Sequence, residues 1–216
     1  MALPNCQFAM FGTSGLPATW GRPKGLVLQK NLGCPMIPFS FFNGKSSMSS
    51  LSMYQASVPV FIRMLGNLHA VLSKAQAHAQ AKGIDELVFT SARLYPDMLP
   101  LSNQIMIATD TAKGCAARLA GVAPPVYEDN EKTFAELNER IAKTLVYLQS
   151  FKHEQIDGSE AREIVLKRRT GEERLLGLPY LLNTALPNFF FHVTTAYAIL
   201  RHNGVDIGKK DYLGNA

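Results

Sequence analysis

The sequence of 216 residues predicts an all-α protein, an antiparallel four-helix bundle with a short β-hairpin before its last long helix. Four segments between residues 54 and 201 repeat apolar residues at intervals of three and four, which is the period of amphipathic helices. The connections between the helices are expected to be short, which favours antiparallel packing around one core. The last segment has no Asp, Glu, Lys or Arg from Leu178 to Leu200, as expected of a central helix.

The first predicted helix runs from Tyr54 to Gly83, a residue type that commonly ends helices. His69 lies between Leu65 and Leu72 in its apolar stripe, so its side chain is expected to face the bundle core.

The second predicted helix follows Asp97, which is expected to cap its N-terminus, and Pro100 suits its first turn. Its apolar stripe runs to Leu119, and Gly121 ends it. Gln104 borders the inward face of this helix.

The third predicted helix opens at Asp129 or Asn130, and Thr133 with Glu136 matches a capping box. Residues 163–176 are predicted to form the β-hairpin, because two short apolar stretches flank a turn sequence there.

The fourth predicted helix spans residues 179–201, and Pro187 is expected to kink it. Its apolar run is long enough to cross a bilayer. However, it carries several Asn and Thr residues and two prolines, and three partner helices need their apolar faces covered. The helix is therefore predicted to lie inside the bundle and not in a membrane.

Residues 1–50 differ in composition from residues 51–216, which are expected to form the bundle domain. They hold five prolines, six glycines, four basic residues and no acidic residue. We expect a disordered or only locally ordered tail, either a transit-like leader or a gene-model extension before a start at Met48 or Met53. Deleting residues 1–47 is expected to leave thermal stability nearly unchanged.

The formal net charge of +5 comes mainly from this tail, because residues 51–216 hold 18 basic and 17 acidic residues. A nearly neutral domain gives no electrostatic reason to expect nucleic acid as a partner. Cys6, Cys34 and Cys115 show no metal-ligand spacing, which is typical of a reducing compartment. A cytoplasmic location is expected, with a mitochondrial one as the alternative.

Asn188 and His192 lie four residues apart on one face of the fourth helix and could contribute to a site in the core. Imidazole suits zinc or nickel, and His69 is the second candidate metal ligand. The alternative is that both histidines are core residues held by hydrogen bonds to amide or hydroxyl groups. The motifs GxSxG, GxGxxG, HExxH and the P-loop are all absent, so common hydrolase, nucleotide-binding and zincin sites are not predicted.

Four segments resemble a family of uncharacterised proteins from bacteria and fungi: Ser52–Phe61, Arg93–Met98, Asp110–Gly114 and Leu186–Gly204. That family is similar to the DinB/YfiT-like four-helix bundles, many of which are thought to be metalloenzymes. The resemblance covers about residues 48–214. It implies the same bundle fold and, because related bundles often pair through their helices, a homodimer.

Metal-binding members of the wider superfamily use a histidine near the second helix and a HxxxH pair on a later helix. His192 matches one member of that pair, whereas position 188 is asparagine, position 196 is alanine and Gln104 lies where the other histidine is expected. The resemblance thus implies a degenerate site.

The residues and the resemblance leave two alternative functions. In the first, the residues Asn188, His192, Gln104 and Asp97 form a pocket that binds a small polar or thiol ligand without catalysis. In the second, the protein is a metal-dependent transferase or hydrolase in which His192 holds zinc or nickel, assisted by Asp97 or His69. Whether the protein is an enzyme is left open at this point.

Overall fold

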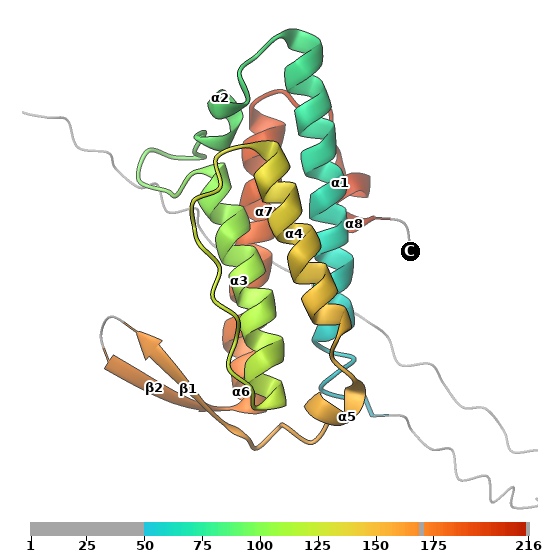
Figure 1. Cartoon of the computed structure of the whole chain (residues 1–216), viewed down its shortest axis with the longest axis vertical. Helices are drawn as coiled ribbons and strands as arrows, with labels where there is room; N and C mark the ends of the chain where they lie inside the picture. Colours follow the sequence, from blue (N-terminus) through green and yellow to red (C-terminus); the bar gives the residue numbers. More distant parts are fainter. Residues whose placement is uncertain (1–49, 169–170, 215–216) are drawn as a thin grey trace, which may run out of the picture. The chain divides into compact units, whose positions relative to one another are not determined.

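The computed structural model describes residues 50–168 and 171–214. In these residues, four long helices pack around one core, as predicted (Figure 1). They are α1 (Val58–Lys82), α3 (Leu101–Ala120), α4 (Phe134–Gln149) and α7 (Leu186–His202). The expectations for residues 1–49 lie outside the described residues.

The long helices are not all joined by short connections. Helix α1 packs against α4 and runs antiparallel to it, since Tyr54 before α1 bonds Asp157 after α4, and Glu86 after α1 bonds Phe134. Helix α3 packs against both α4 and α7. The segment 121–133 returns along the bundle before α4 begins, so that α3 and α4 run in the same direction (Figure 1).

Short elements cover the ends and one side of this bundle. The strands β1 (Glu163–Arg168) and β2 (Gly171–Leu176) form the predicted hairpin, and their antiparallel register pairs Glu163 with Leu176 and Arg168 with Gly171. The remaining elements are α2 (Glu86–Thr90), α5 (His153–Ile156), α6 (Gly177–Tyr180), η1 (Leu181–Ala185) and α8 (Lys209–Leu213).

Local sequence sets several of the helix ends. Gly83 and Gly121 end α1 and α3 in the left-handed conformation, with φ of 62° and 74°, which glycine adopts without steric cost. Thr133 and Glu136 form the predicted capping box, but α4 begins at Phe134 and not at Asp129 or Asn130.

The prediction that Asp97 caps the second helix is wrong. Helix α3 begins at Leu101, Pro100 is its N-cap residue, and Asp97 is exposed in the preceding loop. A proline disfavours helical geometry in the residue before it, so the helix could not extend back through Leu99 towards Asp97.

Pro187 marks the place where the last helix departs from α geometry. The chain passes from α6 through one turn of π-helix, η1, into α7, and Pro187 lies in the first turn of α7. Proline has no backbone N–H and cannot supply the α-helical bond to the carbonyl of Asn183. The predicted kink is therefore realised as a wider π turn just before the proline.

Gly177 fixes the hairpin to the bundle. A Cβ atom at this position would collide with the backbone carbonyl of Ser159, and the neighbouring Leu178 N–H donates to the Glu160 carbonyl at 3.0 Å. This close contact holds the base of the hairpin against the start of α6.

The core itself is apolar and continuous. Phe61 of α1 and Phe189 of α7 are fully buried and pack edge to face with ring centroids 4.9 Å apart. Among residues 50–168 and 171–214, no helix has both the length and the apolar character needed to cross a membrane.

Candidate functional site

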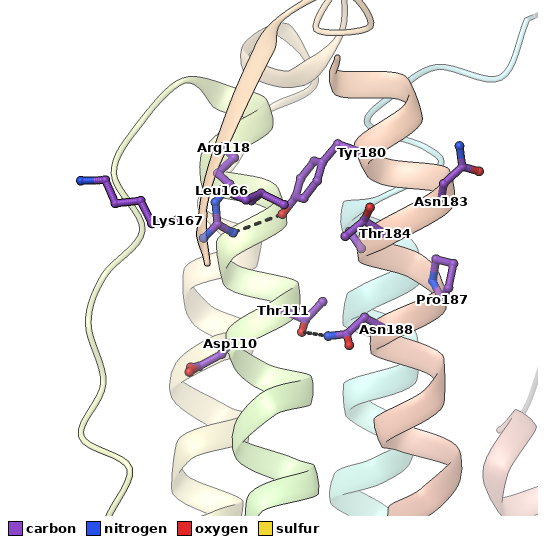
Figure 2. A pocket seen from close by; sticks show the side chains of 11 residues that line it. Asp110, Thr111, Arg118, Leu166, Lys167, Tyr180, Asn183, Thr184, Pro187 and Asn188 are labelled. Carbon is purple, nitrogen blue, oxygen red and sulfur yellow. Dashed lines mark hydrogen bonds between the residues drawn. The ribbon is translucent and has the colours of Figure 1, made fainter. Parts of the chain in front are cut away.

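A cavity of about 580 Å³ lies between α3, the strand β1 and the turn that joins α6 to α7 (Figure 2). Its size falls in the range of small-molecule sites. Most of its lining side chains are polar. They are Asp110, Thr111, Arg118, Leu166, Lys167, Tyr180, Asn183, Thr184, Ala185, Pro187 and Asn188.

The helical periods of two elements bring these side chains to one place. Thr111 and Arg118 are seven residues apart on α3, so they share one face two turns apart. On the opposite wall, the π turn η1 presents Asn183 and Thr184, and Asn188 follows in α7. The irregular turn before Pro187 thus forms part of the cavity wall.

Two hydrogen bonds link the walls, one near each end. The Arg118 guanidinium donates from Nη1 to the Tyr180 hydroxyl at 3.1 Å, and the Asn188 amide donates to Thr111 Oγ1 at 2.8 Å (Figure 2). Among the described residues, no carboxylate forms an ion pair with Arg118.

Asp110 lines the cavity, but its carboxylate is already bonded to two basic side chains of the protein. Its Oδ1 atom accepts bonds from Lys113 Nζ and Arg140 Nη2, each at 2.6 Å. Lys113, which the sequence places one turn from Asp110, is only 4 % exposed and also lies over the ring of Tyr127. The negative charge of Asp110 is therefore balanced by Lys113 and Arg140.

The Tyr180 hydroxyl also lies against the thiol of Cys115 in the interior. Burial raises the pKa of the Cys115 thiol to about 12, although the Arg118 charge and the Tyr180 hydrogen bond oppose the shift. Burial likewise raises the pKa of Tyr180 to about 12. Both groups keep their protons at neutral pH, so neither the thiolate nor the phenolate is available there.

A second polar feature is the pair formed by His192 of α7 and Gln104 of α3. His192 Nδ1 and Gln104 Oε1 are 2.7 Å apart, and the two residues are 8 % and 2 % exposed. Gln104 Nε2 donates to the Leu99 carbonyl at 2.9 Å, which turns its oxygen towards the imidazole. Nδ1 must then be the donor, and Nε2 of the neutral ring keeps its lone pair.

Burial lowers the pKa of His192 below its ordinary value of 6.5. An imidazole in this environment loses hydration when it becomes charged, and the carboxylates that could compensate are not among its hydrogen-bond partners in the described part of the chain. The neutral form is therefore favoured at pH 7.

The four residues predicted to share one pocket are separated by the structure. Asn188 lines the cavity, whereas His192 and Gln104 form their pair deeper between α3 and α7 and do not belong to the cavity lining. Asp97 is exposed in the loop before α3 and lies in neither place.

The expected inward position of His69 is wrong as well. His69 is exposed, and its Nδ1 lies 2.8 Å from Oδ1 of Asn138 on α4. The inner row of α1 runs through Leu65, Leu68 and Leu72, all buried, and position 69 is turned about 100° from position 68. His69 and His192 thus bond to different helices, and no group of three or more His, Cys, Asp or Glu residues in the described chain is placed to hold a metal.

Several cavity residues were not anticipated from the sequence, namely Thr111, Arg118, Lys167, Tyr180, Asn183 and Thr184. One sequence signal was available for Arg118. A glycine in the middle of a helix costs about 1 kcal/mol relative to alanine, and Gly114 lies one turn before this arginine. Such a glycine indicates that something approaches the helix closely.

A sequence profile and a solved structure identify known proteins that are similar to this chain. The sequence profile of a domain of unknown function, DUF1993, matches residues 53–213. The chain is also similar to a DinB family member protein from Shewanella denitrificans, whose crystal structure is known. The two share 44 % sequence identity and a TM-score of 0.71, over 76 % of this chain and 92 % of that one. No curated protein matches this chain.

Proposed function

Because this chain belongs to the DUF1993 family of DinB-like helical bundle proteins, we propose that it binds a small polar ligand and does not catalyse a reaction on it. The proposed site is the open cavity between α3, β1 and the α6–α7 turn. The observation that carries the proposal is the convergence of charged, amide and hydroxyl side chains from three elements on one cavity of suitable size.

The chemistry of the lining supports binding over catalysis. A nucleophile or general base needs a group that can lose its proton near neutral pH. The thiol of Cys115 and the hydroxyl of Tyr180 both have a pKa of about 12, and Asp110 is bonded to Lys113 and Arg140. The Arg118 guanidinium, the amides and the hydroxyls of the lining remain, and these recognise polar groups through hydrogen bonds.

The proposal is tested by a thermal-shift screen of small polar metabolites and thiols, followed by calorimetry of each compound that raises the melting temperature. We expect at least one compound to bind with a stoichiometry of one, because a ligand that binds only the folded state stabilises it. Asn188→Leu should weaken this binding, since it removes an amide from the cavity wall.

Asn138→Leu is the matched control. Asn138 also joins two helices through a 2.8 Å hydrogen bond, to His69, but lies outside the cavity lining. Equal loss of ligand in both variants would show an indirect effect on the fold, and a screen without any binder would refute the proposal.

A second candidate function is a metal-dependent transferase or hydrolase that uses His192. One observation favours it: the Gln104 carbonyl oxygen orients the ring from Nδ1 and leaves the Nε2 lone pair in the neutral form. Metal-binding histidines are commonly held in this way. Zinc or nickel would need further ligands, and the nearest candidates from the sequence, His69 and Asp97, do not join His192.

Metal analysis of the purified protein separates the two functions. Stoichiometric zinc or nickel that disappears in His192→Ala would support the metal-dependent function. A protein without bound metal, whose melting temperature does not change when zinc or nickel is added, would support the binding function.

The predicted homodimer remains a proposal that rests on the resemblance alone. Size-exclusion chromatography with light scattering tests it, and a monomer at high protein concentration would contradict it.

A further inference from the structure

We propose that the ligand of this cavity is an organic anion, whose carboxylate or phosphate group binds Arg118. This inference rests on the proposed binding function and names the chemical class of its ligand. Its physical basis is the unequal distribution of charge along the cavity.

Arg118 has capacity for a further partner. Its guanidinium carries five N–H donors, and among the described residues its one side-chain hydrogen bond goes to the neutral hydroxyl of Tyr180. The residue is partly exposed, and its side chain reaches the cavity (Figure 2). A planar guanidinium binds carboxylate and phosphate groups through paired N–H bonds, which are among the stronger hydrogen bonds in proteins.

The other charges of the lining leave a positive excess at this end. Lys167 of β1 also lines the cavity, but its side chain is directed away from Arg118 (Figure 2). Asp110 is the acidic residue of the lining, but Lys113 and Arg140 already bind its carboxylate. A ligand anion therefore meets Arg118 without an opposing free carboxylate in the lining.

Gly114 gives Arg118 its position. The Arg118 side chain folds back over the helix, and a Cβ atom at residue 114 would lie 2.5 Å from its Nη1 atom. The helix thus carries a destabilising residue where the guanidinium crosses it, which is expected if the guanidinium must be held at the cavity wall.

The amide and hydroxyl groups at the other end of the cavity indicate what the rest of the ligand contains. Thr111 and Asn188 lie about 10 Å along the helix from Arg118, since seven residues separate positions 111 and 118 and each adds about 1.5 Å. Asn183 and Thr184 add amide and hydroxyl groups to the wall. A ligand of hexose size, with hydroxyl groups along its body and an anionic group at one end, matches this arrangement.

Three hexoses with the same kind of polar body serve as probes: glucose 6-phosphate, glucuronate and glucose. Isothermal titration calorimetry of the full chain, at constant ionic strength, measures the affinity of each. We expect both anions to bind at least about tenfold more tightly than glucose, the gain of a charge-assisted pair. The stronger of the two anions identifies phosphate or carboxylate as the preferred group.

Variants then connect the affinity to Arg118. Arg118→Gln should weaken binding of the anions about tenfold and leave glucose unchanged. Arg201→Gln is the matched control, because Arg201 also lies in the last turn of a long helix but outside the cavity lining. Gly114→Ala should keep the fold, since the colliding atom is the far end of a flexible side chain, yet it should weaken anion binding by displacing that end from its place beside Tyr180.

Glucose binding as tightly as its charged analogues, or anion affinity that survives Arg118→Gln, would overturn the inference while the proposed binding function stands. Failure of all three sugars to bind would also overturn it, and the metabolite screen then decides separately about the proposed function.

Discussion

Two arginines near α3 show how the same side chain can serve structure in one region and remain available in another. The Arg140 side chain on α4 is 1 % exposed and makes four hydrogen bonds and one further ion-pair contact. The hydrogen bonds go to Thr109 Oγ1, the Glu128 carbonyl, Glu131 Oε1 and Asp110 Oδ1, and Asp129 Oδ1 lies 2.9 Å from Nη2. Arg118, by contrast, is partly exposed and bonds one neutral hydroxyl.

The pKa of Arg140 reflects these contacts. Burial alone would lower it, but the Glu131 hydrogen bond and the charges of Asp110, Glu131 and Asp129 outweigh burial and raise the pKa above its ordinary value. The returning segment 121–133 supplies Asp129 and Glu131, so the arginine fastens this segment to the bundle. A buried cation that several carboxylates pair with holds structure, whereas a partly exposed one with free donors can bind a ligand.

Arg140→Met tests the structural role of Arg140 directly. It leaves Asp129 and Glu131 without their cation, while Asp110 keeps Lys113. Removing one partner of a buried ion pair costs about 3–5 kcal/mol, and we expect about 3 kcal/mol here because the Asp110 and Asp129 side chains are 39 % and 57 % exposed. Urea unfolding measures the loss. A loss below about 1 kcal/mol, the value of an exposed ion pair, would show that the cluster is not structural.

Asp110→Asn tests the residue that both regions share. Lys113 and Arg140 each lose a charged acceptor, and we expect a loss of about 1.5–3 kcal/mol in the free energy of unfolding. The cavity also becomes more positive, so glucose 6-phosphate should bind more tightly. Glu163→Gln removes an exposed carboxylate that pairs with Arg174 and should change neither property much. Weaker anion binding in Asp110→Asn would contradict the assignment of charge in the cavity.

Arg118→Gln should change stability by less than about 1 kcal/mol, the usual value of a basic residue in the last turn of a helix. Its effect should instead appear in ligand binding. If urea unfolding showed a loss comparable to that of Arg140→Met, the contrast between the two arginines would fail.

The smallest expected effect is a change in the pH dependence of stability caused by His192. Burial lowers its pKa in the folded state, so below about pH 6.5 the unfolded chain binds more protons than the folded one. The stability contributed by neutral His192 is fully present above that pH and is lost as the pH falls through the folded-state pKa. Unfolding at pH 7.5 and 5.5 should show a smaller difference in His192→Gln than in the unaltered chain, and an equal difference would contradict the prediction.

The fold was largely predictable because its determinants are local. Periodic apolar residues gave the four long helices, Gly83 and Gly121 gave two of their ends, and Thr133 with Glu136 gave the capping box of α4. The direction of α4 was not predictable, because the length of segment 121–133 permits it to pack either way. The start of α3 was misplaced because Asp97 is a favourable cap residue in isolation, while the later Pro100 sets the boundary.

The candidate site was only partly predictable. Asn188 lines the cavity, but His192, Gln104 and Asp97 do not. Helical periodicity assigns a residue to a face with an uncertainty of about one position, or about 100°, which is enough to turn His69 from the core to the surface. It also does not reveal which residue will lie opposite.

The helices, several of their ends and the interruption before Pro187 could be predicted from the sequence, because each follows from residues within one or two turns. Which polar groups meet depends on tertiary packing. Arg118 and Tyr180 are 62 positions apart, and Arg140 binds groups from α3 and from the segment before α4. Whether an arginine is paired or free depends on these long-range contacts, and they are fixed by how the helices pack.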